Sequence, residues 1–289
     1  MRTTPPVVVG ICGSRSSQEA VRWAADDAAR RRARLQIVHA VSAPLDRGPR
    51  YGQEEFELLE SEGLRLLDSA RQQATGVAPA VEVSTELIHA PIGPILIDRS
   101  KTSQMLVIGG RGPRALSRAI AGSLDFTLSR HAHCPVAVLH FRSNRAWDLS
   151  RPRGAIVVGV DGSESSSRAI EVAFEEASLR DAKLVALHAR SNDSHQLRVA
   201  GWTDVETEEQ ALLAECLAGF AERYPEVAVQ RVVVESQPLR HLYDLSEDAE
   251  LLVVGSRGRG GFVGLTYGSM SQALLNAVSC PIIVARPEA

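Results

Sequence analysis

The sequence predicts an α/β protein built from two tandem copies of one domain, each a doubly wound, parallel, five-stranded sheet with helices on both faces. Two observations lead to this prediction. Segments of the first half recur in the second half, and within each half short β-branched runs alternate with longer runs of helical periodicity. Because parallel strands need a crossover connection, this alternation favours parallel sheets covered by helices.

The repeat is visible in pairs of matching segments. VVVGICGS at Val7–Ser14 matches IVVGVDGS at Ile156–Ser163, and LVIGGRG at residues 106–112 matches LVVGSRG at residues 252–258. The offset is 149 residues in the first pair (159 minus 10) and 146 in the second (255 minus 109). The two copies therefore differ in length by three residues in the middle of the repeat.

The repeat also indicates the domain boundaries. We expect one domain at residues 1–143 and a second at residues 155–289. The segment between them, residues 144–154, is polar and contains Pro152, which is typical of a linker.

The elements of the first copy follow from its apolar pattern. A helix capped by Ser16 or Ser17 follows the first strand, and a second helix, with Gly63 on its apolar face, follows a Pro/Gly-rich loop at residues 43–52. Two shorter helices are expected at residues 92–100 and 123–132. The predicted strands are Val7–Ile11, Leu35–Val41, Val81–Ile88, Met105–Ile108 and Val136–Phe141.

The second copy repeats the series, with a long helix from about Asp204 to Arg223. Its strands are expected near Ile156, Leu184, Val229, Leu251 and Ile282. A Rossmann-like strand order, 3-2-1-4-5, would reverse the winding between strands one and four. Ligands of such sheets bind beyond the carboxyl ends of the strands at that point.

Composition excludes several functions. The net charge of -3 provides no general attraction to nucleic acid, and the run Arg30–Arg32 is interpreted as a solvated helix end. No apolar run approaches the ~18 residues that a membrane span needs. We expect a cytoplasmic protein whose four cysteines are thiols.

A glycine pattern, G-x2-G-x9-G-S, occurs in both copies after the fourth predicted strand. Glycines at a strand end expose successive N–H groups, and a new helix adds a partial positive charge, so the pattern is typical of a phosphate site. Structural turns use glycine too, and a duplicated fold would keep some glycines without any ligand. Neither a P-loop nor a dinucleotide fingerprint is present, so NAD is not expected. The pattern and its arginines comprise Gly109, Arg111, Gly112, Gly122 and Ser123 in the first copy, and Gly255, Arg257, Gly258, Gly268 and Ser269 in the second.

These residues resemble the universal stress protein family in its tandem form, and the glycine pattern resembles that of its ATP-binding branch. The resemblance also involves V-G-V-D-G-S at Val158–Ser163, V-H-A at residues 38–40, L-H-A at residues 187–189 and H-C-P-V at residues 133–136. It implies an ATP-binding stress-response protein, with Mg²⁺ as the companion ion. Besides the glycine pattern, it implies contacts from Gly10, Cys12, Ala40 and Val41 in the first copy, and from Asp161, Gly162, Ser163 and Ala189 in the second.

The first copy departs from this pattern at Cys12, which occupies the position of Asp161. A thiol cannot supply a carboxylate to ribose hydroxyls or to a metal-bound water. One such charge-assisted contact is worth roughly 1.5–3 kcal/mol, so we expect the first site to bind ATP more weakly than the second, or differently. A redox-sensing role for Cys12 is the less favoured interpretation.

Other candidates receive structural interpretations. His39 and His188 end the second strands, where a base is conceivable, but the sequence shows no partner that would orient them. His131, His133 and Cys134 lie as densely as metal ligands do, yet the second copy lacks half of them. We therefore assign no catalytic residue and no metal ligand.

The expected function is nucleotide-dependent regulation through a downstream protein that the sequence does not identify. The resemblance implies a homodimer of tandem chains. The alternative is a slow ATPase or nucleotidyl hydrolase using the same pocket, and a third possibility is an interaction protein that has kept its glycines without a ligand.

Overall fold

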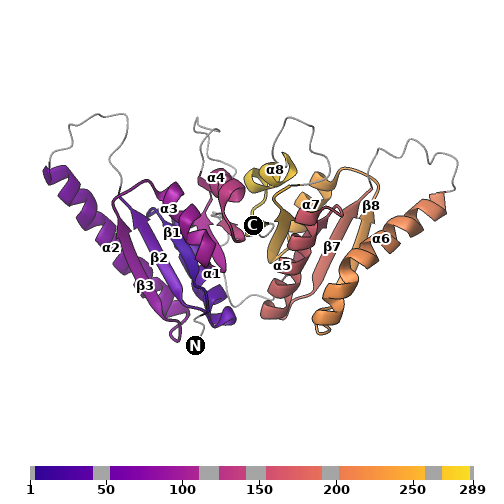
Figure 1. Cartoon of the computed structure of the whole chain (residues 1–289), viewed down its shortest axis with the longest axis horizontal. Helices are drawn as coiled ribbons and strands as arrows, with labels where there is room; N and C mark the ends of the chain where they lie inside the picture. The colour runs from indigo at the N-terminus through magenta and orange to yellow at the C-terminus, as the bar shows by residue number, and fades with distance from the viewer. Residues whose placement is uncertain are drawn as a thin grey trace. The chain divides into compact units, whose positions relative to one another are not determined.

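The computed structural model describes residues 4–41, 53–110, 124–140, 154–190, 202–257 and 269–286. The chain divides into two compact units, Met1–Leu149 and Ser150–Ala289. Each unit is a parallel sheet with helices on both faces, which confirms the predicted fold class (Figure 1).

Unit 1 contains five strands in the order β3-β2-β1-β4-β5, the predicted order. All four pairings within it are parallel. Its elements are β1 Val7–Ile11, α1 Arg15–Arg31, β2 Leu35–Ala40, α2 Gln53–Val77, β3 Val83–Ile88, α3 Ile92–Arg99, a 3₁₀ turn at Ser100–Thr102, β4 Met105–Gly109, α4 Leu124–His131 and β5 Val136–Leu139.

The central strands of unit 1 are buried because helices cover both faces. Helices α1 and α2 pack together on one face, and α3 and α4 pack together on the other (Figure 1). Trp23 of α1 is fully buried against the sheet, as the helical periodicity predicts. Every residue of β1 is buried, which explains its continuous apolar run.

Several boundaries in unit 1 differ from the prediction by one or two residues, and two of them have a visible cause. Helix α1 is capped by Ser14, not by Ser16 or Ser17, because the Ser14 side chain accepts a hydrogen bond from the Ser17 N–H at 3.2 Å. Three serines within four positions can each cap a helix, and the sharp turn at Gly13 selects the first. Strand β3 begins at Val83, two residues later than expected, because the Val81 N–H donates to the Ala78 carbonyl in a turn.

Unit 2 repeats the architecture, with the order β10-β9-β6-β7-β8 and parallel pairing throughout. Helices α5 and α6 pack on one face and α7 and α8 on the other. Its elements are β6 Ile156–Val160, α5 Glu164–Arg180, β7 Leu184–Ala189, α6 Trp202–Arg223, β8 Val229–Val234, α7 Pro238–Ser246, β9 Leu251–Gly255, α8 Ser269–Ala277 and β10 Ile282–Ala285.

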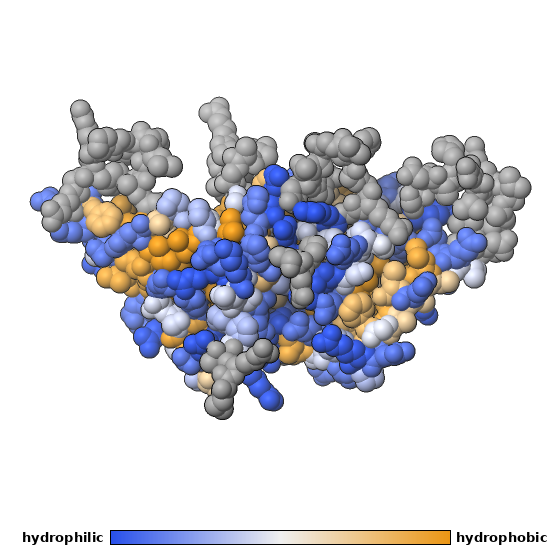
Figure 2. Space-filling model, viewed as in Figure 1, coloured by the Kyte–Doolittle hydropathy of each residue, from blue (hydrophilic) through white to orange (hydrophobic). Residues whose placement is uncertain are grey.

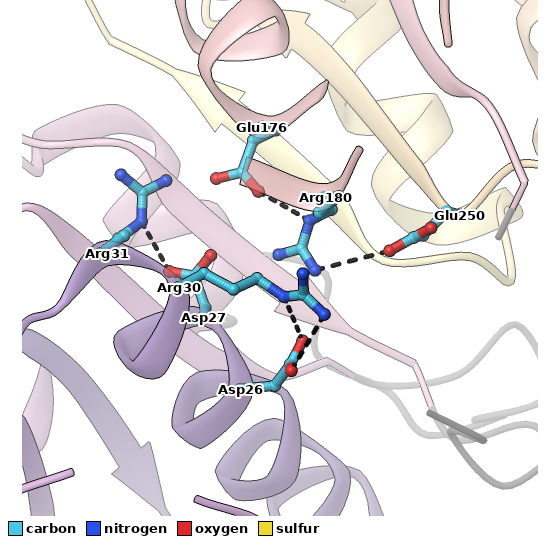
Figure 3. A network of polar contacts seen from close by, with 7 residues as sticks. All are labelled: Asp26, Asp27, Arg30, Arg31, Glu176, Arg180 and Glu250. Carbon is cyan, nitrogen blue, oxygen red and sulfur yellow. Dashed lines mark hydrogen bonds and ion pairs between the residues drawn. The ribbon is translucent and has the colours of Figure 1, made fainter. Parts of the chain in front are cut away.

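An ion network secures the carboxyl end of α5. Arg180 is fully buried and donates through Nε to the equally buried Glu176 at 2.9 Å, while its Nη1 lies 3.5 Å from Glu250, just before β9 (Figure 3). In unit 1, the corresponding end of α1 carries the pair Arg31 and Asp27 at 2.8 Å. Arg180 therefore links the end of α5 to the residue before β9, whereas the pair of Arg31 and Asp27 lies within α1.

The surface of the described residues carries both hydrophilic and hydrophobic side chains (Figure 2). Its most exposed large hydrophobic side chains are Leu58 and Leu64 of α2, and hydrophobic surface lies over this helix on the left of Figure 2. Among the described helices, none combines the length and apolar character needed to cross a membrane.

Candidate functional site

The end of the first strand makes the same turn in both units. Gly13 has φ of +75° and Gly162 has φ of +72°, a left-handed conformation that side chains disfavour. The next residue, Ser14 or Ser163, then caps the following helix. The chain thus reverses directly from the carboxyl end of a strand into a helix N-terminus, where free N–H groups favour an anion.

The residue before this glycine differs between the units. The Asp161 Oδ1 accepts from the Ser163 N–H at 2.9 Å, and the Asp161 N–H donates to the Ser166 Oγ at 3.2 Å. Asp161 is half-buried. In unit 1 the exposed Cys12 thiol donates to the Ser14 Oγ at 3.3 Å. A carboxylate is therefore held in place at the end of β6, and a thiol occupies the matching position at the end of β1.

The neighbouring strand, β4 or β9, brings the start of the glycine pattern to this point. A Cβ on Gly109 would lie 2.5 Å from the backbone of Ser16, and one on Gly255 would lie 2.7 Å from the Ser165 Oγ. Only glycine lets these strand ends approach the first turn of α1 or α5 so closely. Strands β1 and β4, like β6 and β9, are parallel neighbours, so the turn and the glycines meet at one edge of the sheet.

Unit 2 fastens its glycine segment with side chains. The Ser165 Oγ accepts from the Arg257 N–H at 3.1 Å and lies 3.4 Å from the Ser256 Oγ. In unit 1, Gly110 occupies the position of Ser256, where a Cβ would lie 2.6 Å from Val138. Serine hydroxyl groups therefore connect the start of the glycine pattern to α5.

The second strand ends beside the same edge. Ala40 and Ala189 are half-buried last residues of β2 and β7, and Val41 donates its N–H to the Ile88 carbonyl at 2.8 Å. His39 and His188, each one residue earlier, contact the carbonyl oxygens of Ile11 and Val160 at 2.9 and 2.8 Å.

The structure brings together only part of the predicted site. Gly10 lies within β1, and a Cβ there would be 3.0 Å from Leu96 of α3, so this glycine serves close helix packing. Ser269 begins α8. The remaining predicted residues lie outside the described residues: Arg111, Gly112, Gly122, Ser123, Gly258 and Gly268.

Sequence reasoning missed Glu209 of α6, whose Oε2 lies 2.9 Å from the His188 Nε2. The matching position of unit 1 is Gly63, so the repeat provides no signal for it. Ser165 and Ser256 were missed because Ser165 lies in the run Ser165–Ser167 and Ser256 directly follows β9, so neither serine stands out in the sequence. Within the described residues, no cluster of three or more His, Cys, Asp or Glu side chains could hold a metal ion.

Comparison with known proteins agrees with this architecture. A family model described as the universal stress protein family matches residues 4–140 and again residues 153–286. Universal stress protein Rv2623 of Mycobacterium tuberculosis is 40% identical over 291 residues, covering 97% of this chain and 96% of that protein. Universal stress protein Mb2028c of Mycobacterium bovis is 41% identical over 286 residues, with the same two coverages.

A solved structure shows the same fold at low identity. The crystal structure of a universal stress protein from Archaeoglobus fulgidus has a TM-score of 0.71 and 15% sequence identity, and the match covers 97% of this chain and 98% of that one. The family model matches twice in tandem, and the relatives are similar over nearly the whole chain. The chain therefore belongs to the universal stress protein family.

Proposed function

We propose that the chain is an ATP-binding regulatory protein of the stress response, with nucleotide sites at residues 1–143 and 155–289. One observation carries this proposal. At one edge of the sheet in unit 2, the Asp161 carboxylate, the end of β9 at Gly255 and the N-terminus of α5 come together. An anion-favouring helix start beside a fixed carboxylate suits a ligand that carries both phosphate and hydroxyl groups.

The residues fit ATP with Mg²⁺ on chemical grounds. Asp161 can accept from ribose hydroxyls or hold a metal-bound water, and the N-terminus of α5 favours the negative charge of the phosphates. Arg257 lies within the glycine segment and supplies positive charge. We assign the phosphates to Gly258, Gly268 and Ser269, and the base to the region of Ala189. Mg²⁺ would offset the charge of the phosphates.

The first site would use the matching groups, Gly109, Gly112, Gly122 and Ser123, without a carboxylate at Cys12. Its affinity for ATP should therefore be lower than that of the second site. By family resemblance, the chain would act in the cytoplasm as a homodimer that contacts a downstream protein in a nucleotide-dependent way.

Isothermal titration of the whole chain with ATP and Mg²⁺ tests this proposal. We expect saturable binding, and Asp161→Ala should weaken the tighter site by roughly tenfold to a hundredfold. If ATP produced no binding heat and displaced no fluorescent ATP analogue, the proposal would be wrong.

A slow ATPase is the alternative to a pure binding role. Steady-state phosphate release with Mg²⁺ distinguishes the two. Multiple turnovers per minute, abolished by Ser269→Ala, would establish an enzyme, whereas bound ATP recovered intact after hours supports binding alone.

A further inference from the structure

A hydrogen-bonded chain of three groups links α6 to the strand end that precedes Asp161. The His188 Nδ1 lies 2.8 Å from the Val160 carbonyl oxygen, and its Nε2 lies 2.9 Å from the Glu209 Oε2. A carbonyl oxygen can only accept, so Nδ1 carries the hydrogen of the first bond. In the second bond, either Nε2 or the Glu209 carboxyl group donates the hydrogen and the other accepts it. The exposed fractions are 6% for the His188 side chain and 22% for Glu209, so the imidazole is shielded from competing water.

This chain ends on the peptide group that carries Asp161. Val160 is the last residue of β6, so its carbonyl and the Asp161 N–H belong to the same planar peptide unit. His188 binds the oxygen of that unit, and the Ser166 Oγ accepts from its N–H at 3.2 Å. Held from both sides, the peptide plane cannot rotate freely, and its orientation determines where the Asp161 side chain begins.

Unit 1 keeps the histidine but lacks the carboxylate. The His39 Nδ1 lies 2.9 Å from the Ile11 carbonyl, as in unit 2. The strands that follow α2 and α6 differ by 146 positions (229 minus 83), so Glu209 corresponds to Gly63. A Cβ at Gly63 would lie 2.9 Å from the His39 Cδ2, so the helix backbone itself packs against the ring.

The two differences therefore occur together. The unit with Asp161 at its strand end has Glu209 behind its histidine, and the unit with Cys12 at that place has a glycine. A carboxylate that must point at a ligand gains from a fixed backbone, whereas a thiol that contributes no charge does not. Residues of this kind do not touch the ligand but orient the group that does, and they commonly set the affinity of a site.

We propose that Glu209 and His188 are positioning residues of the second nucleotide site. Glu209 holds the His188 ring in the orientation in which Nδ1 binds the Val160 carbonyl, and this fixes the Asp161 carboxylate for the ligand. The inference rests on the proposed function, because ATP is the ligand that the carboxylate would contact.

Three variants test the proposal by titration with ATP and Mg²⁺. Glu209→Ala removes the bond to Nε2, and we expect ATP binding at the tighter site to weaken about fivefold, the usual effect of one lost hydrogen bond. Glu209→Gln can still donate an amide N–H to Nε2, so its affinity should stay within about twofold of the wild type. Glu208→Ala is the control, because Glu208 is an exposed neighbour on the same helix.

Nuclear magnetic resonance supplies a readout that needs no nucleotide. In the ligand-free chain, Glu209→Ala should shift the ¹⁵N signals of the His188 ring and the amide signals of Asp161 and Gly162, whereas Glu208→Ala should leave them in place. Unchanged His188 and Asp161 signals in Glu209→Ala would overturn the proposal, as would equal affinity losses in the Ala and Gln variants. If the wild type bound no ATP, the proposed function would fail, and the ring and amide signals would still decide whether Glu209 positions Asp161.

Discussion

At the residue scale, one substitution separates two otherwise similar strand ends. Both ends have a glycine with positive φ and a serine cap, so the backbone that follows Cys12 matches that following Asp161. What differs is the group presented: a carboxylate that accepts from the Ser163 N–H, or a thiol that donates to the Ser14 Oγ. The difference in affinity between the two sites should therefore be carried by side chains and not by the fold.

Restoring the carboxylate in unit 1 should strengthen the first site. Cys12→Asp places a charge where the Ser14 N–H can orient it, and we expect ATP affinity at the weaker site to rise about tenfold. Cys12→Ser is the matched control, since it changes the size of the side chain little and adds no charge. Titration with ATP measures both. Equal affinities in the Asp and Ser variants would show that charge at this position does not control binding.

At the element scale, the close approach of a strand end to a helix start holds the candidate site. The sequence predicted the strands and helices because apolar periodicity is a local pattern, whereas the strand order came from likeness to doubly wound sheets. It could not predict that Ser14 caps α1, since several serines there are equivalent in type. Nor could it find Glu209, because the pairing with His188 depends on how α6 packs against β7.

The glycine at the strand end should be required for stability. Gly255→Ala would place a Cβ 2.7 Å from the Ser165 Oγ and 2.9 Å from its carbonyl oxygen, so the strand end or the helix must move. We expect a loss of roughly 1–3 kcal/mol in the free energy of unfolding. Gly219→Ala in α6 is the control, because nothing lies within 4 Å of its added Cβ and helix propensity favours alanine. Urea unfolding measures both, and equal midpoints would refute the packing argument.

The opposite end of α5 should be sensitive to its buried arginine. Arg180→Met would leave the Glu176 and Glu250 carboxylates buried without this cation, at a cost of about 3–5 kcal/mol in unfolding free energy. Arg223→Met is the comparison, because the Arg223 side chain is 62% exposed and its ion pair with Glu171 should contribute less than about 1 kcal/mol. Thermal unfolding of the two variants checks the order, and a smaller effect for Arg180 would contradict it.

At the scale of the whole molecule, a duplicated architecture carries two unequal candidate sites. Each unit repeats the same strand order and the same turn into a helix, and both match the universal stress protein family. Unit 2 combines Asp161 with the Ser165 contact to Arg257 and the Glu209 contact to His188, whereas unit 1 has Cys12 and Gly63 at the positions of Asp161 and Glu209. The repeat explains why the sequence predicted two sites, and the side chains explain why we expect them to differ.

Native mass spectrometry during an ATP titration tests this central claim most directly, because it counts nucleotides on each chain. We predict one ATP per chain at low concentration and a second at a concentration about tenfold higher, with the low-concentration step lost in Asp161→Ala. Two equal steps that Asp161→Ala leaves unchanged, or no bound ATP at any concentration, would contradict the account.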